Sequence, residues 1–80
     1  MARIDWPIYV LDLLAELPAR DADLIFEKVR MLERFPRMYP IRIKGRFRRY
    51  RWLLAGRWLV FHRVIGDIVY IRGVWPSQIP

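Results

Sequence analysis

The sequence predicts an α+β domain in which an N-terminal helical hairpin packs on one face of a small antiparallel sheet. The chain has 80 residues, which is the length of one domain. Apolar residues follow a helical period up to about residue 35 and a period of two from about residue 47. There is no cysteine, which excludes disulfides and thiolate metal sites.

The first helix is expected to be short. The sequence does not decide whether a short strand over residues 4–6 precedes it. Asp5 is expected to cap the helix, with Pro7 in its first turn. Pro18 interrupts the pattern. The apolar stripe expected to face the sheet is Ile8, Leu11, Leu14 and Leu17.

The second helix is expected over residues 19–35. Pro36 ends it, because proline cannot continue a helix without losing a backbone hydrogen bond. The tight break between the two segments predicts a helical hairpin. The second stripe consists of Ala22, Ile25, Val29 and Leu32.

Three strands are expected over residues 47–54, 57–64 and 68–75, with Ala55-Gly56 and Gly66-Asp67 as two-residue turns. This register puts large apolar side chains, Tyr50, Trp52, Leu59 and Phe61, against the helices. The face away from the helices then carries Arg49, Arg51, Leu53, Trp58, Val60 and His62, with Arg49 opposite His62. In the last strand Ile71 is expected opposite His62 and Val74 opposite Leu59. A bulge in this strand would change these pairings, and the sequence does not decide whether one is present.

Charge is divided unevenly along the chain. Residues 1–34 hold five basic and seven acidic side chains, whereas residues 35–80 hold ten basic side chains and one acid, Asp67. Thirteen of the fifteen basic residues are arginine, whose guanidinium binds phosphate in a bidentate manner. We therefore expect a polyanionic partner. No apolar run is long enough for a membrane span, and a cytoplasmic location is the default expectation.

These patterns predict a site on the uncovered sheet face. Arg49 and Arg51 are candidates to hold phosphate, and His62 is the best acid–base candidate because its ordinary pKa lies near neutrality. Trp58 is a candidate for base stacking, with packing against Leu53 as the alternative. Three further assignments follow from position: Arg46 and Arg48 form a basic rim, and Trp75 covers the sheet end or receives a partner peptide. No metal cluster or cofactor motif is present.

The order of these segments resembles the RelE/ParE superfamily of toxins from type II toxin–antitoxin systems. The resemblance covers almost the whole chain. It is carried by residues 13–18 (LLAELP), 29–38 (VRMLERFPRM), 49–51 (RYR), 56–64 (GRWLVFHRV) and 69–74 (VYIRGV). The resemblance implies a toxin that enters the ribosomal A site and cuts mRNA, with Arg49 and Arg51 orienting the RNA. It also implies a cognate antitoxin that neutralises the toxin.

Two alternatives remain open within this resemblance. RelE-like enzymes use basic, histidine or tyrosine groups after the last strand, where this chain holds Pro76, Ser77 and Gln78. ParE-like members lack the ribonuclease residues and poison DNA gyrase. An inactive relative that only binds RNA or a partner is the other alternative, because a fold does not fix a function.

Overall fold

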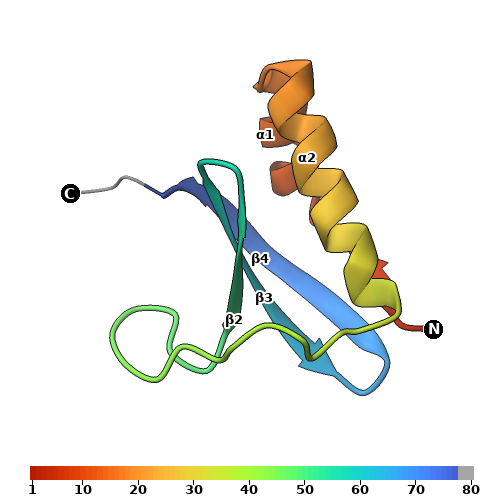
Figure 1. Cartoon of the computed structure of the whole chain (residues 1–80), viewed down its shortest axis with the longest axis vertical. Coiled ribbons are helices and arrows are strands. Elements are labelled where there is room, and N and C mark those ends of the chain that lie inside the picture. Colours follow the sequence, from red (N-terminus) through yellow and green to blue (C-terminus); the bar gives the residue numbers. More distant parts are fainter. Residues whose placement is uncertain (78–80) are drawn as a thin grey trace.

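The computed structural model describes residues 1–77, and Gln78 lies outside them (Figure 1). The protein is α+β, with two helices packed on a four-stranded mixed sheet. The helices are α1 (Ile8–Glu16), α2 (Ala19–Arg30) and the 3₁₀ turn η1 (Met31–Glu33). The strands are β1 (Arg3–Asp5), β2 (Arg51–Ala55), β3 (Trp58–Ile65) and β4 (Ile68–Pro76).

The two helices confirm the expected hairpin, but only one of the predicted stripes is right. In α2 and η1 the buried residues Ile25, Val29 and Leu32 follow the prediction. In α1 the buried residues are Val10 and Leu14, whereas Ile8 is 77% exposed. The buried face of α1 is thus set by Val10 and Leu14, which share one side of a helix at i, i+4 spacing. The N-cap residue is Pro7 and not Asp5 as predicted.

The sheet has the strand order β1-β4-β3-β2, and β1 runs parallel to β4. The short first strand is therefore present, over residues 3–5, but the expectation of a wholly antiparallel sheet is wrong. A parallel pair needs a long crossover connection, and the two helices lie on the path from β1 to the hairpins. No helix within residues 1–77 is long and apolar enough to cross a membrane.

The turn between β2 and β3 lies one residue later than expected, which shifts the cross-strand partner of each residue by two positions. Ala55 pairs with Trp58, so the turn residues are Gly56 and Arg57, and Gly56 takes the left-handed φ of 61° that glycine allows. A shift of two positions in the cross-strand pairing leaves each side chain on the same face of the hairpin. The predicted division of this hairpin into two groups of residues is therefore correct, although the predicted partners are wrong.

The prediction of which group faces the helices is also wrong. Leu53, Ala55 and Val60 are buried in the same core as the helix residues Ile25 and Val29. The aromatic group lies on the opposite side of the sheet, which we call the open face. Figure 1 shows both helices on the other side of the sheet. Compact aliphatic side chains fill the narrow layer between helix and sheet, whereas the larger rings pack among themselves on the open face.

β4 contains a bulge, a feature that the sequence pattern did not decide. Ile71 pairs with His62 as predicted, but Gly73 pairs with Phe61, so Arg72 is an extra residue in β4. Beyond the bulge Val74 pairs with Val60 and joins the core, and its predicted pairing with Leu59 is wrong. The bulge thus allows both Ile71 and Val74 to face the helices.

Candidate nucleic-acid interface

Arg51 and His62 are direct partners across β2 and β3, on the helix-covered side of the sheet. His62 is 0% exposed and is the one buried polar side chain found among the described residues. Neither of its ring nitrogens has a hydrogen-bond partner within residues 1–77. The prediction that His62 lies on the uncovered face is therefore wrong.

The environment of His62 keeps its ring neutral. Burial is the main cause that lowers the pKa of His62 to about 4. The nearby Val60 backbone, which does not reach hydrogen-bond geometry with either ring nitrogen, opposes the shift, and the positive charge of Arg51 adds to it. A neutral ring without solvent contact has no path to a proton on a substrate at the open face. The structure thus places the expected acid–base residue in the core.

Arg51 holds the segment that joins η1 to β2. Its Nη1 donates to the backbone oxygen of Tyr39 at 2.7 Å and to that of Arg37 at 3.3 Å. The Tyr39 ring meets His62 edge-on, with 6.3 Å between ring centroids. This segment therefore covers the part of the helix-side face where Arg51 and His62 lie, and the guanidinium of Arg51 is turned toward it.

Arg49 and Arg48 lie in the loop before β2 and not in a strand. Both side chains are exposed, and Arg49 has a φ of 75°. The backbone N–H of Arg49 donates to the Arg42 oxygen at 2.7 Å, which closes the base of the loop. The predicted pairing of Arg49 with His62 is wrong, because Arg51 occupies that position.

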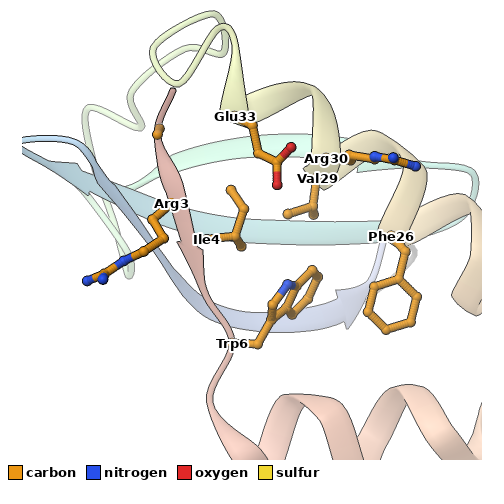
Figure 2. A pocket seen from close by; sticks show the side chains of 8 residues that line it. Arg3, Ile4, Trp6, Phe26, Val29, Arg30 and Glu33 are labelled. Atoms are coloured by element: carbon orange, nitrogen blue, oxygen red, sulfur yellow. The ribbon is translucent and has the colours of Figure 1, made fainter.

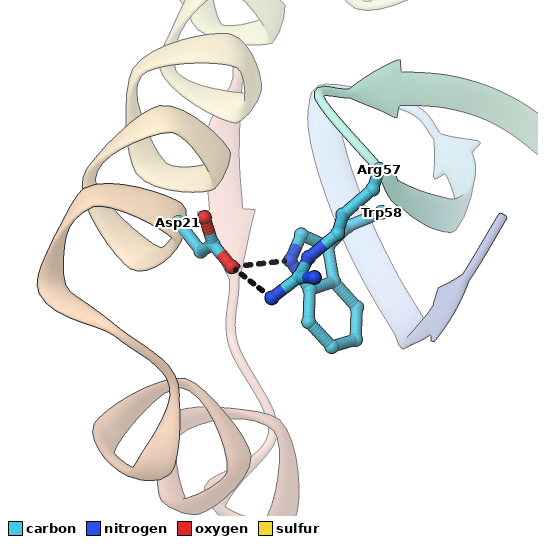
Figure 3. A network of polar contacts seen from close by, with 3 residues as sticks. All are labelled: Asp21, Arg57 and Trp58. Carbon is cyan, nitrogen blue, oxygen red and sulfur yellow. Dashed lines mark hydrogen bonds and ion pairs between the residues drawn. The ribbon is translucent and has the colours of Figure 1, made fainter.

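Trp58 takes part in a polar cluster that joins the β2–β3 turn to α2 (Figure 3). Its Nε1 donates to Oδ2 of Asp21 at 3.1 Å, and Nη2 of Arg57 donates to the same oxygen at 3.1 Å. The hydrogen bond from Trp58, followed by that from Arg57, lowers the pKa of Asp21, although burial opposes it. The half-buried indole packs beside the core, so Trp58 is not available as a stacking platform on the open face.

The open face carries a cluster of aromatic rings. Phe47 stacks on Phe61, with ring centroids 4.6 Å apart and planes inclined by 23°. Trp75 lies 4.7 Å from Phe47 and 5.5 Å from Phe61, and Tyr50 meets Phe47 edge-on at 6.1 Å. Trp75, predicted to cover the sheet end or receive a partner peptide, is thus a member of this cluster.

Four arginines surround these rings. The guanidinium carbon of Arg42 lies 5.9 Å from the ring centroid of Phe61. Those of Arg46 and Arg72 lie 5.2 and 5.8 Å from the ring centroid of Phe47. Arg63 lies 4.6 Å from the centroid of Tyr50. Such cation–π contacts orient a guanidinium and leave N–H groups at its edge that can bind an anion. Arg42 Nε also donates to the Lys44 backbone oxygen, and Nη1 of Arg72 donates to the Tyr9 hydroxyl, each at 3.2 Å. The arginine–aromatic face is defined as Arg42, Arg46, Arg63, Arg72, Phe47, Tyr50, Phe61 and Trp75.

No member of this face forms an ion pair within residues 1–77. The one salt bridge in that part of the chain joins Arg57 to Asp21 on the opposite side of the sheet. The same residues contain no group of three or more histidine, cysteine, aspartate or glutamate side chains suited to a metal. The face therefore presents positive charge that acidic neighbours do not neutralise.

The loop between η1 and β2 supplies two arginines of this face, Arg42 and Arg46, and two of its rings, Phe47 and Tyr50. Its base is closed by an isolated bridge between Ile41 and Arg51 and by the Arg42 N–H donating to the Tyr50 oxygen at 2.8 Å. Gly45 and Phe47 have φ values of 79° and 65°, and Arg49 follows with the same sign. A bulky residue such as Phe47 rarely adopts this conformation, which is strained and concentrates at functional sites.

Two cavities open on the arginine–aromatic face. The larger, about 350 Å³, lies among Arg42, Arg46, Phe47, Leu59, Phe61, Trp75, Pro76 and Ser77. The smaller, about 240 Å³, lies beside Tyr50, Arg63 and Tyr70. Neither cavity has a carboxylate in its lining.

A third cavity, about 400 Å³, lies on the helix side of β1 (Figure 2). The rings of Trp6 and Phe26 lie 5.1 Å apart on one side of it, and Glu33 adds a carboxylate to the lining. Figure 2 shows the side chain of Arg3 directed away from the Trp6 ring. This mixed lining is a poorer match for a polyanion than the open face.

Sequence reasoning found Arg46 and Trp75 but missed most of the face. Arg63 follows Phe61 by two residues, and this spacing places both on one side of a strand. Because Phe61 is predicted to face the helices, this spacing does not by itself indicate that Arg63 lies on the open face. Arg42 and Phe47 lie in a loop without periodicity, and Arg72 is reached only through the bulge, so no simple pattern identifies them.

Comparison with known proteins finds no matching protein-family model, no matching curated protein and no matching solved structure.

Proposed function

We propose that this protein is a growth-inhibiting toxin of the RelE/ParE kind that holds messenger RNA on its arginine–aromatic face. The observation that supports the proposal best is the set of four arginines, each over an aromatic ring and none paired with a carboxylate within residues 1–77. Guanidinium groups bind phosphates, and aromatic rings at a surface stack on unpaired bases. Phe47, Tyr50 and Trp75 are half-buried and supply the accessible ring surface of this face.

Binding, rather than cleavage, is the activity that these residues support. Arginine stabilises developing negative charge but is a poor proton shuttle, because its pKa lies above about 12. His62 is the sole histidine of the chain and is buried away from this face. We therefore propose that the protein arrests translation by occupying the message.

A cognate antitoxin and a cytoplasmic site of action belong to the same proposal. The helical hairpin exposes several apolar side chains, including Ile8 at 77% and Tyr9 at 56%. An apolar partner segment that covers them would stabilise this small fold, because binding to the native state alone stabilises it. Co-expression of a short reading frame next to the gene should restore growth if that frame encodes the antitoxin.

The test is a reconstituted translation reaction that receives the purified full chain. We expect protein synthesis to stop while the message, examined by primer extension, keeps its full length. The Arg46→Gln and Arg63→Gln variants should inhibit less, and Arg34→Gln, which removes an exposed arginine outside the face, should inhibit as the wild type does.

A parallel supercoiling reaction with DNA gyrase distinguishes the proposal from the main alternative, a ParE-like toxin that poisons gyrase. Uninhibited translation together with inhibited gyrase would replace the proposal with a ParE-like function. Cleaved message would require an acid–base group other than His62. Uninhibited translation and unaffected gyrase, with no measurable RNA binding, would reject the toxin proposal.

A further inference from the structure

We infer that the 350 Å³ cavity beside Phe47 is a subsite for one unpaired base of the bound RNA, with the adjoining phosphate held by Arg42 and Arg46. The inference rests on the proposed function and specifies how the RNA is read. It assigns a preference for single strands, because the bases of a duplex are paired and unavailable to the cavity.

The shape of the cavity suits a planar apolar group. Phe47 and Phe61 stack on each other, and Trp75 stands against both at inclinations of 48° and 69°. The rings thus form a corner with room beside it and not a closed stack. A volume of about 350 Å³ lies within the ~300–1,000 Å³ range of small-molecule sites.

The positive charge of two arginines at the rim of the cavity indicates that its planar ligand also carries an anionic group. Arg42 and Arg46 are exposed and line the same cavity, over Phe61 and Phe47 respectively. A purely apolar ligand would cover these guanidinium groups without giving them a partner, which costs free energy. A nucleotide satisfies both requirements, since its base is planar and its phosphate is negative.

The backbone holds both walls in place. Phe47 reaches its position through a left-handed φ of 65°, in a loop whose base is closed by backbone hydrogen bonds. Trp75 lies over Gly73, where a Cβ would be 2.6 Å from Cζ3 of the indole. A side chain at position 73 would push the indole away, so the cavity depends on the left-handed backbone at Phe47 and on the missing side chain at Gly73 and is preorganised for its ligand.

The experiment compares two strands of equal charge on the full-length protein. One is an adenosine strand of about six nucleotides, within the span of small single-strand sites, and the other is the same ribose–phosphate strand without bases. We expect the adenosine strand to bind about tenfold more tightly or better, as stacking of a base on aromatic rings provides. A 2-aminopurine at one position of the wild-type complex should be quenched as it stacks.

Two variants assign the preference to the cavity. Trp75→Leu and Phe47→Gly should each reduce the ratio of the two affinities toward one, and glycine adopts the left-handed φ at position 47 without strain. Phe35→Leu, which changes an exposed ring outside the face, should keep the wild-type ratio. Arg42→Gln should weaken the binding of both strands together, because both strands carry phosphates.

The outcomes separate this inference from the proposed function. Equal, salt-sensitive binding of both strands by the wild type, without quenching, would overturn the base subsite and leave RNA binding intact. A ratio that neither folded cavity variant changes would also overturn it. Failure of both strands to bind at low salt would overturn the subsite and the proposed function together.

Discussion

The indole of Trp75 lies over Gly73, two residues earlier in β4, so closely that a Cβ at position 73 would stand 2.6 Å from Cζ3. Gly73 has no left-handed φ, so this glycine is required by contact and not by backbone conformation. Because Trp75 also packs on Phe47 and Phe61, the absence of a side chain at position 73 determines the shape of the open face.

Replacing Gly73 with alanine should therefore displace the indole. We expect a loss of roughly 1–3 kcal/mol in the free energy of unfolding, the usual cost of overpacking. Urea unfolding followed by tryptophan fluorescence measures it. Gly66→Ala is a useful contrast, because no atom lies within 4 Å of a Cβ there and its cost comes from a positive φ instead. Equal stability of Gly73→Ala and the wild type would contradict the described contact.

The protein should lose stability in mild acid because of His62. Its pKa is about 4 in the folded chain and about 6.5 when unfolded, so the unfolded chain binds more protons between these values. Stability is then unaffected above about pH 7.5 and falls as the pH drops from about 6.5 to 4, by roughly 2 kcal/mol at about pH 5.

The His62→Leu variant should remove this pH dependence. It should also be at least as stable as the wild type near pH 7.5, because both ring nitrogens lack hydrogen-bond partners within residues 1–77 and such groups are costly in a core. Chemical unfolding at a series of pH values tests both statements. An unchanged slope between about pH 6.5 and 5 in the variant would show that another group causes it.

The Asp21 cluster should matter for stability mainly through Trp58. Asp21→Ala removes the acceptor of a part-buried indole N–H, whereas Arg57→Ala removes a partner that is largely exposed and screened by solvent. We expect the first variant to lower the Tm clearly and the second to change it little. Thermal unfolding by circular dichroism checks the order, which would be reversed if the ion pair dominated.

RNA binding should depend strongly on salt. If the four arginines of the open face each neutralise one phosphate of a single strand, the logarithm of affinity should fall with the logarithm of salt concentration with a slope of about −3. Replacing one of them, such as Arg72, with glutamine should reduce the slope by about 0.7. Fluorescence anisotropy over a salt series measures it, and a slope near zero would exclude phosphate contacts.

The sequence was sufficient to predict the helical hairpin, the α2 stripe and the alternation along β2 and β3. It did not predict which sheet face the helices cover, because alternation is symmetrical: Leu53 and Val60 form one apolar group, and Trp52 and Phe61 form another. The assumption that the larger rings fill the core placed His62 outside. Only the packing of Leu53, Ala55 and Val60 with the helices resolves this choice.

The candidate site was predictable in kind but not in its members. The excess of arginine and aromatic residues after residue 35 predicts a surface that carries both, and the arginine–aromatic face is such a surface. That it binds a polyanion is part of the proposal. Its residues depend on a one-residue shift of the β2–β3 turn, a bulge at Arg72 and left-handed backbone at Phe47. None of these features has a reliable local signature in a single sequence.

The most direct test of the account compares Arg51→Gln with Arg63→Gln. Both change arginine in the central hairpin, but the Arg51 guanidinium binds backbone oxygens on the helix side and that of Arg63 lies over Tyr50 on the open face. We expect Arg51→Gln to destabilise the fold by about 1–2 kcal/mol through lost charged hydrogen bonds, with RNA affinity nearly unchanged in the folded protein. Arg63→Gln should leave stability nearly unchanged and weaken RNA binding severalfold. The reverse result, with RNA affinity lost in Arg51→Gln and kept in Arg63→Gln, would contradict the assignment of the open face.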